Sequence, residues 1–526
     1  MKNTFYFLFS LLILGFTNFS LSQNIEIYKG QELSARQFGS STSVLYHNDN
    51  ETVTFDVKTK AIGRSSFQIS IFDNRLNLVQ SNELEFPNKD MKYERILEIK
   101  GKMFLFMTTY DRNEKTTTLY GTTVNKHAQM GGKVYELGVF DAKSKRNNVS
   151  FNFSNNEDST KILVSILPSY ERTEKQSVRF LTYNMDFMEL ENLEFQFPYL
   201  DRDFKLDKVL MDRFENIHIL GITTKREKSS IFKPQDRTAS LYSYYKGASE
   251  LKEYKIGIDE EEGEYLNQIT LGTDKNGLLH CAGFYSDNRF PTMKGIFVFT
   301  LDLETQSIKN VKSQQFTEDF INQFLTERQQ KRKERAKDRG KDKFSELNNL
   351  VVRDLLWKEG GGFYFIAEYY YYYVTTNHNA QTGATTYTHH YNYRDIMVAD
   401  VKEDNSVNWL ARIPKIQNTV NDGGRFSGIA YLLTGDNTLN IIFNDHANNA
   451  NVINPPKRLN FNIRKGVTVL VQIDKDGNNP IKMPLISNKK ERYILAPKRF
   501  ASKTSNELVM IATRGKKFRF MRIAFK

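Results

Sequence analysis

Most of the chain alternates between apolar and polar residues in short runs that are rich in Val, Ile, Phe, Tyr and Thr. Asn, Asp, Gly and Lys residues separate these runs. Alternation with a period of two places neighbouring side chains on opposite faces of a strand, so this pattern predicts many short antiparallel strands. We therefore expect an all-β protein.

One type of apolar run recurs, often ending near an Asp and followed by a polar turn and a second strand. The recurrences are 67–80, 133–145, 178–190, 240–251, 295–307, 395–406, 467–479 and 517–526. Another apolar strand pair precedes each, for example at 103–110, 161–167, 216–224, 277–285, 362–370, 439–445 and 507–514. The repeating unit is therefore about four strands long, which is typical of a radial array of sheets.

These units predict a β-propeller of seven or eight four-stranded blades over residues 23–526. The segment 24–33 has a strand with no partner before it, and the last unit has no strand after Phe525. If the N-terminal strand completes the last sheet, the propeller has eight blades, which we favour because closure removes the open ends. Seven blades result if two units form one elaborated blade. Two β-sandwiches or barrels in tandem are the structural alternative.

Residues 1–22 have the pattern of a signal peptide: Lys2, a short apolar run, and small residues at 20–22. We expect cleavage before Gln23. A membrane anchor is the alternative, but it needs about 20 apolar residues, and the run from Phe5 to Phe16 is shorter. No later stretch is apolar enough to cross a bilayer. We therefore expect an exported protein, periplasmic or associated with the outer membrane, with no transmembrane segment after cleavage.

Composition narrows the possible classes of protein. The 526 residues are 39% hydrophobic and 26% charged, which is typical of a folded chain and excludes a disordered or polytopic membrane protein. The length exceeds the roughly 250–300 residues of one ordinary core, in agreement with a repeat. Cys281 is the single cysteine, so an intramolecular disulfide, a Cys-based zinc site and an iron–sulfur cluster are excluded.

An insertion interrupts the repeat at 316–347. Phe316, Phe320, Ile321, Phe324 and Leu325 have helical spacing, and Thr317 is suited to cap the helix. Residues 328–343 follow with nine basic and three acidic residues, spaced as a solvated helix with pairs between neighbouring turns. The functional alternative is contact with an anionic lipid surface or an acidic partner. The candidate residues for that contact are Arg328, Lys331, Arg332, Arg335 and Arg339. Nucleic acid is not expected, because no aromatic residues interleave the charges.

The sequence holds no recognisable catalytic motif, and we expect a non-enzymatic protein without cofactor or metal. Cys281 lies in an apolar alternating run, where a buried inert thiol is expected, and His280 faces the opposite side of that strand. The segment 474–478 resembles a calcium loop, but its Gly is at the fourth position instead of the sixth, so a hairpin turn is favoured.

The most unusual segment is 363–393, which holds nine of the 27 tyrosines and three of the eight histidines. Two tyrosine-rich strands flank a turn-rich tip at 377–383, and this predicts a long, projecting β-hairpin. One face could pack on the body and leave the other exposed for recognition of a protein or a sugar. The hairpin could instead be packed entirely against neighbouring loops. The candidate partner-binding residues are Tyr369, Tyr371, Tyr373, His378, Tyr387, His389, Tyr391 and Tyr393.

From about Asn349 onward the chain resembles uncharacterised exported β-propeller proteins of Gram-negative bacteria. The matching segments are GGGFYFIAEYYYYY (360–373), 389–415, NDGGRFSGIAYLL (421–433), 466–480 and 514–526. The resemblance implies a propeller and an envelope location. It implies no activity and carries no catalytic residues.

Together these features favour a non-enzymatic binding or scaffold protein of the bacterial cell envelope that recognises a protein partner through its loops and the tyrosine-rich hairpin. A carbohydrate-binding or carbohydrate-cleaving propeller is the alternative; cleavage would need paired carboxylates. The net charge of +12 resides in two zones, since 328–343 contributes +6 and 489–526 contributes +10. The rest of the chain is mildly acidic.

Overall fold

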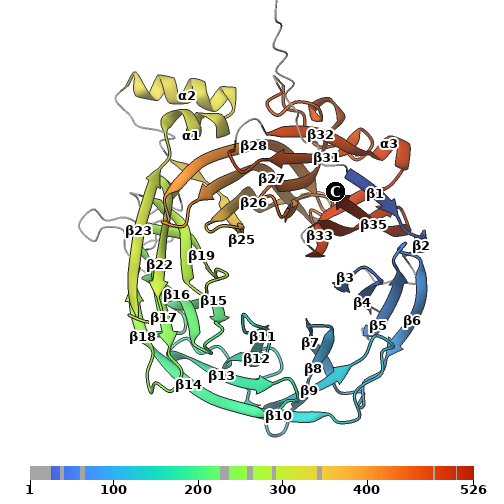
Figure 1. Cartoon of the computed structure of the whole chain (residues 1–526), viewed down its shortest axis with the longest axis vertical. Helices are drawn as coiled ribbons and strands as arrows, with labels where there is room; N and C mark the ends of the chain where they lie inside the picture. Colours follow the sequence, from blue (N-terminus) through green and yellow to red (C-terminus); the bar gives the residue numbers. More distant parts are fainter. Residues whose placement is uncertain are drawn as a thin grey trace, which may run out of the picture.

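The computed structural model describes residues 25–35, 41–59, 65–225, 236–256, 265–286, 292–339, 346–455, 457–477, 480–504 and 506–526. In this part of the chain, eight antiparallel sheets stand around a ring (Figure 1). Each sheet is one blade, and its strands follow one another from the centre of the ring outward. The fold is an eight-bladed β-propeller, as the repeat predicted. The expected signal peptide, 1–22, lies outside the described residues.

The first four blades each contain four consecutive strands. Blade 1 comprises β3 (Ser41–His47), β4 (Glu51–Thr59), β5 (Ser65–Asp73) and β6 (Leu78–Leu84). Blade 2 comprises β7 (Lys92–Ile99), β8 (Lys102–Asp111), β9 (Thr116–Val124) and β10 (Tyr135–Asp141). Blade 3 comprises β11 (Ser150–Asn155), β12 (Lys161–Leu167), β13 (Lys175–Asn184) and β14 (Glu189–Leu200). Blade 4 comprises β15 (Phe204–Met211), β16 (Ile217–Lys225), β17 (Asp236–Tyr244) and β18 (Lys252–Lys255).

The remaining blades complete the ring. Blade 5 comprises β19 (Tyr265–Thr273), β20 (Leu279–Ser286), β22 (Gly295–Asp302) and β23 (Ser307–Gln315). Blade 6 comprises β25 (Leu350–Trp357), β26 (Phe363–His378), β27 (Thr385–Val401) and β28 (Val407–Val420). Blade 7 comprises β29 (Ala430–Leu433), β30 (Leu439–His446), β31 (Gly466–Ile473) and β32 (Ile481–Ser487). Blade 8 comprises β33 (Ile494–Thr504), β34 (Glu507–Arg514), β35 (Lys517–Phe525) and β1 (Ile25–Lys29). Short elements are β2 (Leu33–Ser34), β21 (Thr292–Met293), β24 (Leu347–Asn348), α3 (Asn488–Glu491) and the 3-10 turn η1 (Ala447–Asn449).

The two ends of the described chain meet in blade 8. Strand β1 pairs antiparallel with β35, from Ile25 opposite Phe525 to Lys29 opposite Met521. Ile25 and Ile27 pack against the buried apolar residues of blades 7 and 8. The predicted closure by the N-terminal strand is therefore confirmed.

The Asp residues that end many apolar runs begin a common turn. Asp73 Oδ1 accepts hydrogen bonds from the backbone N–H groups of Arg75 and Asn77, at 2.9 and 2.8 Å. Leu76 between them has a φ of 62°, as required in a hairpin loop closed by one left-handed residue. Asp212 makes the same turn in blade 4, binding the N–H groups of Phe214 and Asn216.

The central strands of each blade carry the core, because both of their faces pack against neighbouring blades. All eight residues of β20 and all eight of β31 are buried. One expected repeat is wrong in detail. Residues 133–145 do not form a central strand, since β10 is the outermost strand of blade 2 and β9 occupies the third position. Its apolar residues pack on one face only, against blade 3.

The insertion forms two helices, α1 (Glu318–Phe324) and α2 (Glu327–Lys337), on the rim of the ring (Figure 1). Thr317 caps α1 as predicted, and Phe320 and Ile321 pack into the core between blades 5 and 6. The basic helix ends at Lys337, earlier than expected. Lys333 and Lys337 of α2 pair with Glu318 of α1. The expected pairs that involve Lys341 and Asp342 lie outside the described residues. Among the described residues, no helix is both long and apolar enough to cross a membrane.

Candidate functional site

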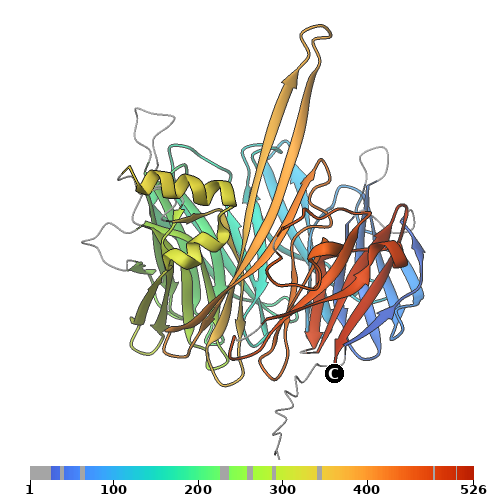
Figure 2. The ribbon, with the colours of Figure 1, turned by 90° about the horizontal axis from the view of Figure 1, so that it is seen from above.

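The predicted hairpin is the most prominent feature of the surface. Strands β26 and β27 extend far beyond the end of blade 6 (Figure 2). They pair continuously from Tyr370 opposite Tyr393 to His378 opposite Thr385. The third strand, β28, supports β27 as far as Val420, which lies opposite His390. The outer part is therefore a two-stranded ribbon on a three-stranded base.

Aromatic side chains form a ladder on each face of the hairpin. On the face towards blade 5, the ring of Tyr371 stacks on that of Tyr373 with centres 6.1 Å apart. On the face towards blade 7, Tyr370 contacts Tyr393 at 4.6 Å and Tyr372 contacts Tyr391 at 5.1 Å between ring centres. Each face therefore presents ordered rings.

Exposure changes along the hairpin, and not from one face to the other as the alternation suggested. Tyr369 and Tyr371 are half-buried near the body, and Tyr393 is buried. Tyr372 and Tyr373, on opposite faces, are each 44% exposed, and Tyr387 near the tip is 61% exposed. The reason is that the hairpin leaves the body lengthwise, so neither face has a neighbouring blade at its outer end.

The hairpin also lacks charge. Residues 369–393 contain no Asp, Glu, Lys or Arg, although 26% of the chain is charged. The N–H of Tyr370 donates to Asn349 O at 2.8 Å, where β25 stops pairing with β26. Backbone groups alternate in direction along a strand, so those of Tyr372, Val374, Thr376 and His378 also point outward from this edge. No described strand continues β25 beside them. Exposed edges normally carry charges or prolines that prevent pairing.

A buried charge network anchors the base of the hairpin. Glu368 of β26 accepts hydrogen bonds from Arg353 Nε at 2.9 Å and from the ammonium of Lys415. Lys415 Nζ also donates to Gln417 Oε1 at 3.1 Å. Glu368 and Lys415 are each 1% exposed. This network therefore joins β25, β26 and β28 at the base of the hairpin.

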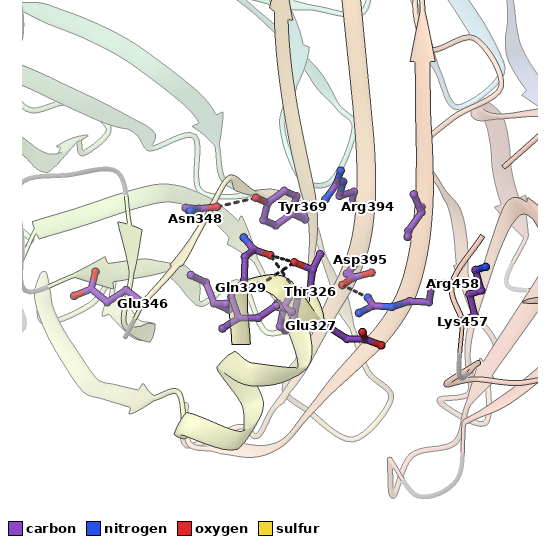
Figure 3. Close-up of a pocket in the computed structure, with 14 residues that line it drawn as sticks. Thr326, Glu327, Gln329, Glu346, Asn348, Tyr369, Arg394, Asp395, Lys457 and Arg458 are labelled. Atoms are coloured by element: carbon purple, nitrogen blue, oxygen red, sulfur yellow. Dashed lines mark hydrogen bonds and ion pairs between the residues drawn. The ribbon is translucent and has the colours of Figure 1, made fainter. Parts of the chain in front are cut away.

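A cavity of about 470 Å³ lies between the hairpin base and the helical insertion (Figure 3). Its apolar floor includes Phe324 and Leu347, and Tyr369 and Arg394 of the hairpin face it. Asn348 accepts a hydrogen bond from the Tyr369 hydroxyl at 2.8 Å. The insertion and the hairpin, both singled out in the sequence, therefore meet at one hollow.

The charges at this cavity are arranged for structure and recognition. Asp395 accepts from Arg412 Nη2 at 2.6 Å and from Arg458 Nη1 at 3.2 Å. A carboxylate that binds two guanidinium groups is a poor nucleophile or base. Arg394 lies with its guanidinium 5.7 Å from the centre of the Tyr371 ring. The walls can hold a polar ligand of modest size through hydrogen bonds.

The five candidate cations of the insertion share one side of α2. Arg328, Lys331, Arg332 and Arg335 are exposed on the helix, and Arg339 is exposed just beyond its end. With about 100° between successive residues, they fall within an arc of about 100°. Ala336 is buried on the side that faces the body. The structure thus groups these residues in one outward stripe, away from the tyrosines.

Histidines that are isolated in the sequence form buried relays within separate blades. His218 bonds Ser243 Oγ through Nδ1 at 2.8 Å and Asp212 Oδ2 through Nε2 at 3.2 Å. His280 meets Asp274 and Thr300 in the same way, each at 3.3 Å. The three residues of the first relay are fully buried, so no substrate reaches Ser243, and the relay ties a turn to the core.

Other groups with chemical potential are enclosed or separated. Cys281 is fully buried, and burial raises the pKa of its thiol well above the usual value. Burial also raises the pKa of Asp354, on the innermost strand of blade 6. Gly477, with a φ of 70°, turns the chain where the sequence resembles a calcium loop. The described residues contain no group of three or more His, Cys, Asp and Glu side chains suited to hold a metal ion.

Comparisons with known proteins find similar solved structures but no matching family. No family model matches the chain, and no curated protein matches it. Among solved structures, the WD40 domain of SCAP from fission yeast has a TM-score of 0.39 and 10% identity, covering 95% of this chain and 98% of that one. The β-propeller domain of the Trilobed protease from Pyrococcus furiosus has a TM-score of 0.31 and 11% identity, covering 73% and 95%. Oligogalacturonate lyase in complex with manganese has a TM-score of 0.35 and 7% identity, covering 95% and 98%.

The sequence predicted the hairpin and the insertion but not the cavity. Asn348, the adjacent Arg394 and Asp395, and Arg458 stand in three separate sequence contexts, and only the blade geometry joins them. The one weak indication of the cavity in the sequence is Arg394-Asp395, the first charged pair after 25 uncharged residues.

Proposed function

We propose that this protein is a non-enzymatic binding protein of the bacterial cell envelope that recognises a protein partner with the tyrosine-rich hairpin, residues 363–393. The observation that carries this proposal is an exposed ribbon of ordered aromatic rings without charge, held at a buried base. Tyrosine supplies large contact area and a hydroxyl at low entropic cost, so it is common at binding hot spots. The envelope location is supported by the signal-like sequence of residues 1–22.

The first experiment tests the side chains. A variant with Tyr372→Ser, Tyr373→Ser and Tyr387→Ser would be compared with Tyr170→Ser, which alters a tyrosine that is 52% exposed elsewhere. The proteins would be used to capture partners from envelope extract, with quantitative mass spectrometry. The triple variant should capture at least tenfold less of one specific partner, since two or three hot-spot residues each contribute about 2 kcal/mol to binding. Equal capture by all three proteins would refute the role of the hairpin.

The second experiment tests the open edge of β26. Val374→Pro removes an N–H that points away from β27 and is tolerated at an edge. Val374→Ala keeps that N–H and removes most of the side chain. If the partner adds a strand to this edge, Pro weakens binding and Ala does not. Equal binding by both variants would leave the ring faces as the contact surface.

Sugar recognition is the second candidate, because the face of an aromatic ring such as Tyr372 can stack on a pyranose. A glycan array probed with the unaltered protein and the triple tyrosine variant separates the two functions. A glycan lost only by the variant would favour sugar binding, and an array without any signal would count against it.

A further inference from the structure

Three cations converge on one pair of tyrosines at the inner side of the hairpin base. The guanidinium of Arg353 lies 5.6 Å from the centre of the Tyr370 ring. The ammonium groups of Lys415 and Lys498 lie 5.8 and 4.5 Å from the centre of the Tyr393 ring. Arg353 and Lys415 come from β25 and β28 of blade 6, and Lys498 comes from β33 of blade 8, so the packing of the blades brings the third cation to the other two.

Two of the three cations share a single bonded carboxylate. Glu368 is shared between Arg353 and Lys415. Arg353 Nη2 is buried and has no hydrogen-bond partner among the described residues, although it lies 2.6 Å from Glu368 Oε2. Lys498 Nζ donates to the Tyr393 hydroxyl at 2.8 Å. No described carboxylate lies within 4 Å of that ammonium.

A further pair of cations stands beside this group. Arg499 follows Lys498 on β33, and Arg425 lies in the segment before β29; both are exposed. Gly424, which precedes Arg425, lies against the Tyr393 ring. Burial, and secondly the charge of Arg499, lower the pKa of Arg425. Burial lowers the pKa of Lys498. The charges of Arg353 and Lys415 act in the same direction, and those of Glu368 and Asp422 oppose it. Mutual repulsion of this kind is relieved when an anion binds.

The position of the group allows access. Strands β25 and β33 are the innermost strands of their blades and stand at the central opening of the ring (Figure 1). Lys498, Arg499 and Arg425 are exposed there, while Lys415 and Glu368 are buried behind them. The exposed cations are therefore accessible to a solute.

We propose that Lys498 and Arg425, backed by Arg353, form an anion-binding site beside Tyr370 and Tyr393. The ligand class is a small molecule or chain end that carries a carboxylate, sulfate or phosphate group. Guanidinium groups bind such planar or tetrahedral oxyanions with two hydrogen bonds, and the ammonium adds a point charge. The site is separate from the exposed part of the hairpin.

The test uses inorganic phosphate, sulfate and glucuronate as probes, with chloride at equal ionic strength as the reference. Isothermal titration calorimetry and thermal unfolding would be measured on the full chain. At least one probe should bind with one-to-one stoichiometry and raise the Tm, and the preferred probe identifies the oxyanion. Lys498→Met should weaken that binding about tenfold, as expected for one charge-assisted hydrogen bond, whereas Lys498→Arg should retain it.

Lys516→Met, an exposed lysine on the turn between β34 and β35, is the matched control and should bind like the unaltered protein. Arg425→Gln is a second variant at an exposed position. If one of the two variants fails to fold, the other still tests anion binding. The proposal would be overturned if none of the three probes bound with one-to-one stoichiometry. So would unchanged affinity in both Lys498→Met and Arg425→Gln. Neither result bears on partner capture, because these variants leave Tyr372, Tyr373 and Tyr387 intact.

Discussion

Tyr373 and His390 stack face to face across the hairpin, with ring centres 4.4 Å apart and planes 5° from parallel. On the opposite face, the Tyr372 hydroxyl bonds His389 Nδ1 at 2.6 Å. Cross-strand aromatic pairs contribute about 0.5–1.5 kcal/mol each beyond the area that they bury. Pairs on both faces stiffen the ribbon at the level where β28 ends, so the exposed rings are presented in a defined order.

The buried pair Glu368–Lys415 should be essential to the base of the hairpin. Glu368→Gln leaves the ammonium of Lys415 in the core without a carboxylate, and we expect a loss of about 3–5 kcal/mol in the free energy of unfolding. The double variant Glu368→Gln/Lys415→Met removes both charges and should recover much of this loss. Urea unfolding measures both values. A loss below about 0.5 kcal/mol in the single variant would contradict the pairing.

Closure of the ring by β1 predicts a stability effect at its apolar side chains. Ile27→Asp places a carboxylate among the apolar residues of blade 8. We expect it to lower the free energy of unfolding by about 2–3 kcal/mol. Ile27→Val keeps the packing and should change it by about 1 kcal/mol or less. Urea unfolding with limited proteolysis checks this, because an open blade 8 would be cut first. Equal stability of the two variants would show that β1 adds little.

The buried carboxyl of Asp354 predicts a dependence of stability on pH. Burial raises its pKa above the ordinary value of 3.8 for an Asp, although it accepts a hydrogen bond from the Tyr431 hydroxyl at 3.0 Å. In the window between the unfolded and folded pKa values the folded state binds more protons, so stability falls as pH rises through it. Asp354→Asn should therefore raise the Tm at pH 7, and this gain should shrink as the pH is lowered below the window. A lower Tm for the variant at pH 7 would show that ionisation of Asp354 is favourable.

The basic stripe of α2 predicts salt-sensitive contact with anionic surfaces. The variant Arg328→Gln/Arg332→Gln/Arg335→Gln should bind phosphatidylglycerol vesicles about 100-fold less well, since each cation near such a surface contributes about 1 kcal/mol. Its free energy of unfolding should stay within about 0.5 kcal/mol, because these side chains are exposed. Vesicle flotation at two salt concentrations measures the effect. Equal flotation of variant and parent would identify the stripe as a solvated helix face.

The central strands were the easiest part of the fold to predict. Strands such as β20 and β31 are buried on both faces and therefore stand out as continuous apolar runs. The position of the outer strand β10 within blade 2 was predicted wrongly. Leu137 and Phe140 are buried, so this half-buried strand has the apolar pattern of a central one. The hairpin was visible because tyrosines and the absence of charge are local properties of the sequence.

The candidate sites divide in the same way. The tyrosines of the hairpin and the arginines of α2 are neighbours in sequence, so composition alone singles them out. Arg353, Lys415 and Lys498 are separated by long stretches of chain, and each looks like an ordinary surface cation until blades 6 and 8 are in place. Contacts between blades are set by ring geometry, which no local pattern contains.

The pairing of β1 with β35 also has a consequence for how the chain folds. Ile25 and Phe525 are opposite one another, so the last blade joins residues from the two extremes of the described sequence. Contacts between residues so far apart in sequence form slowly, because closing a long loop costs entropy before the contacts add stability. The other seven blades can each form from a continuous stretch of chain, whereas β1 must wait, unpaired, until β35 is in place. Ring closure should therefore be the last and slowest step of folding, and an isolated chain that lacks either strand should stop at an open array of blades.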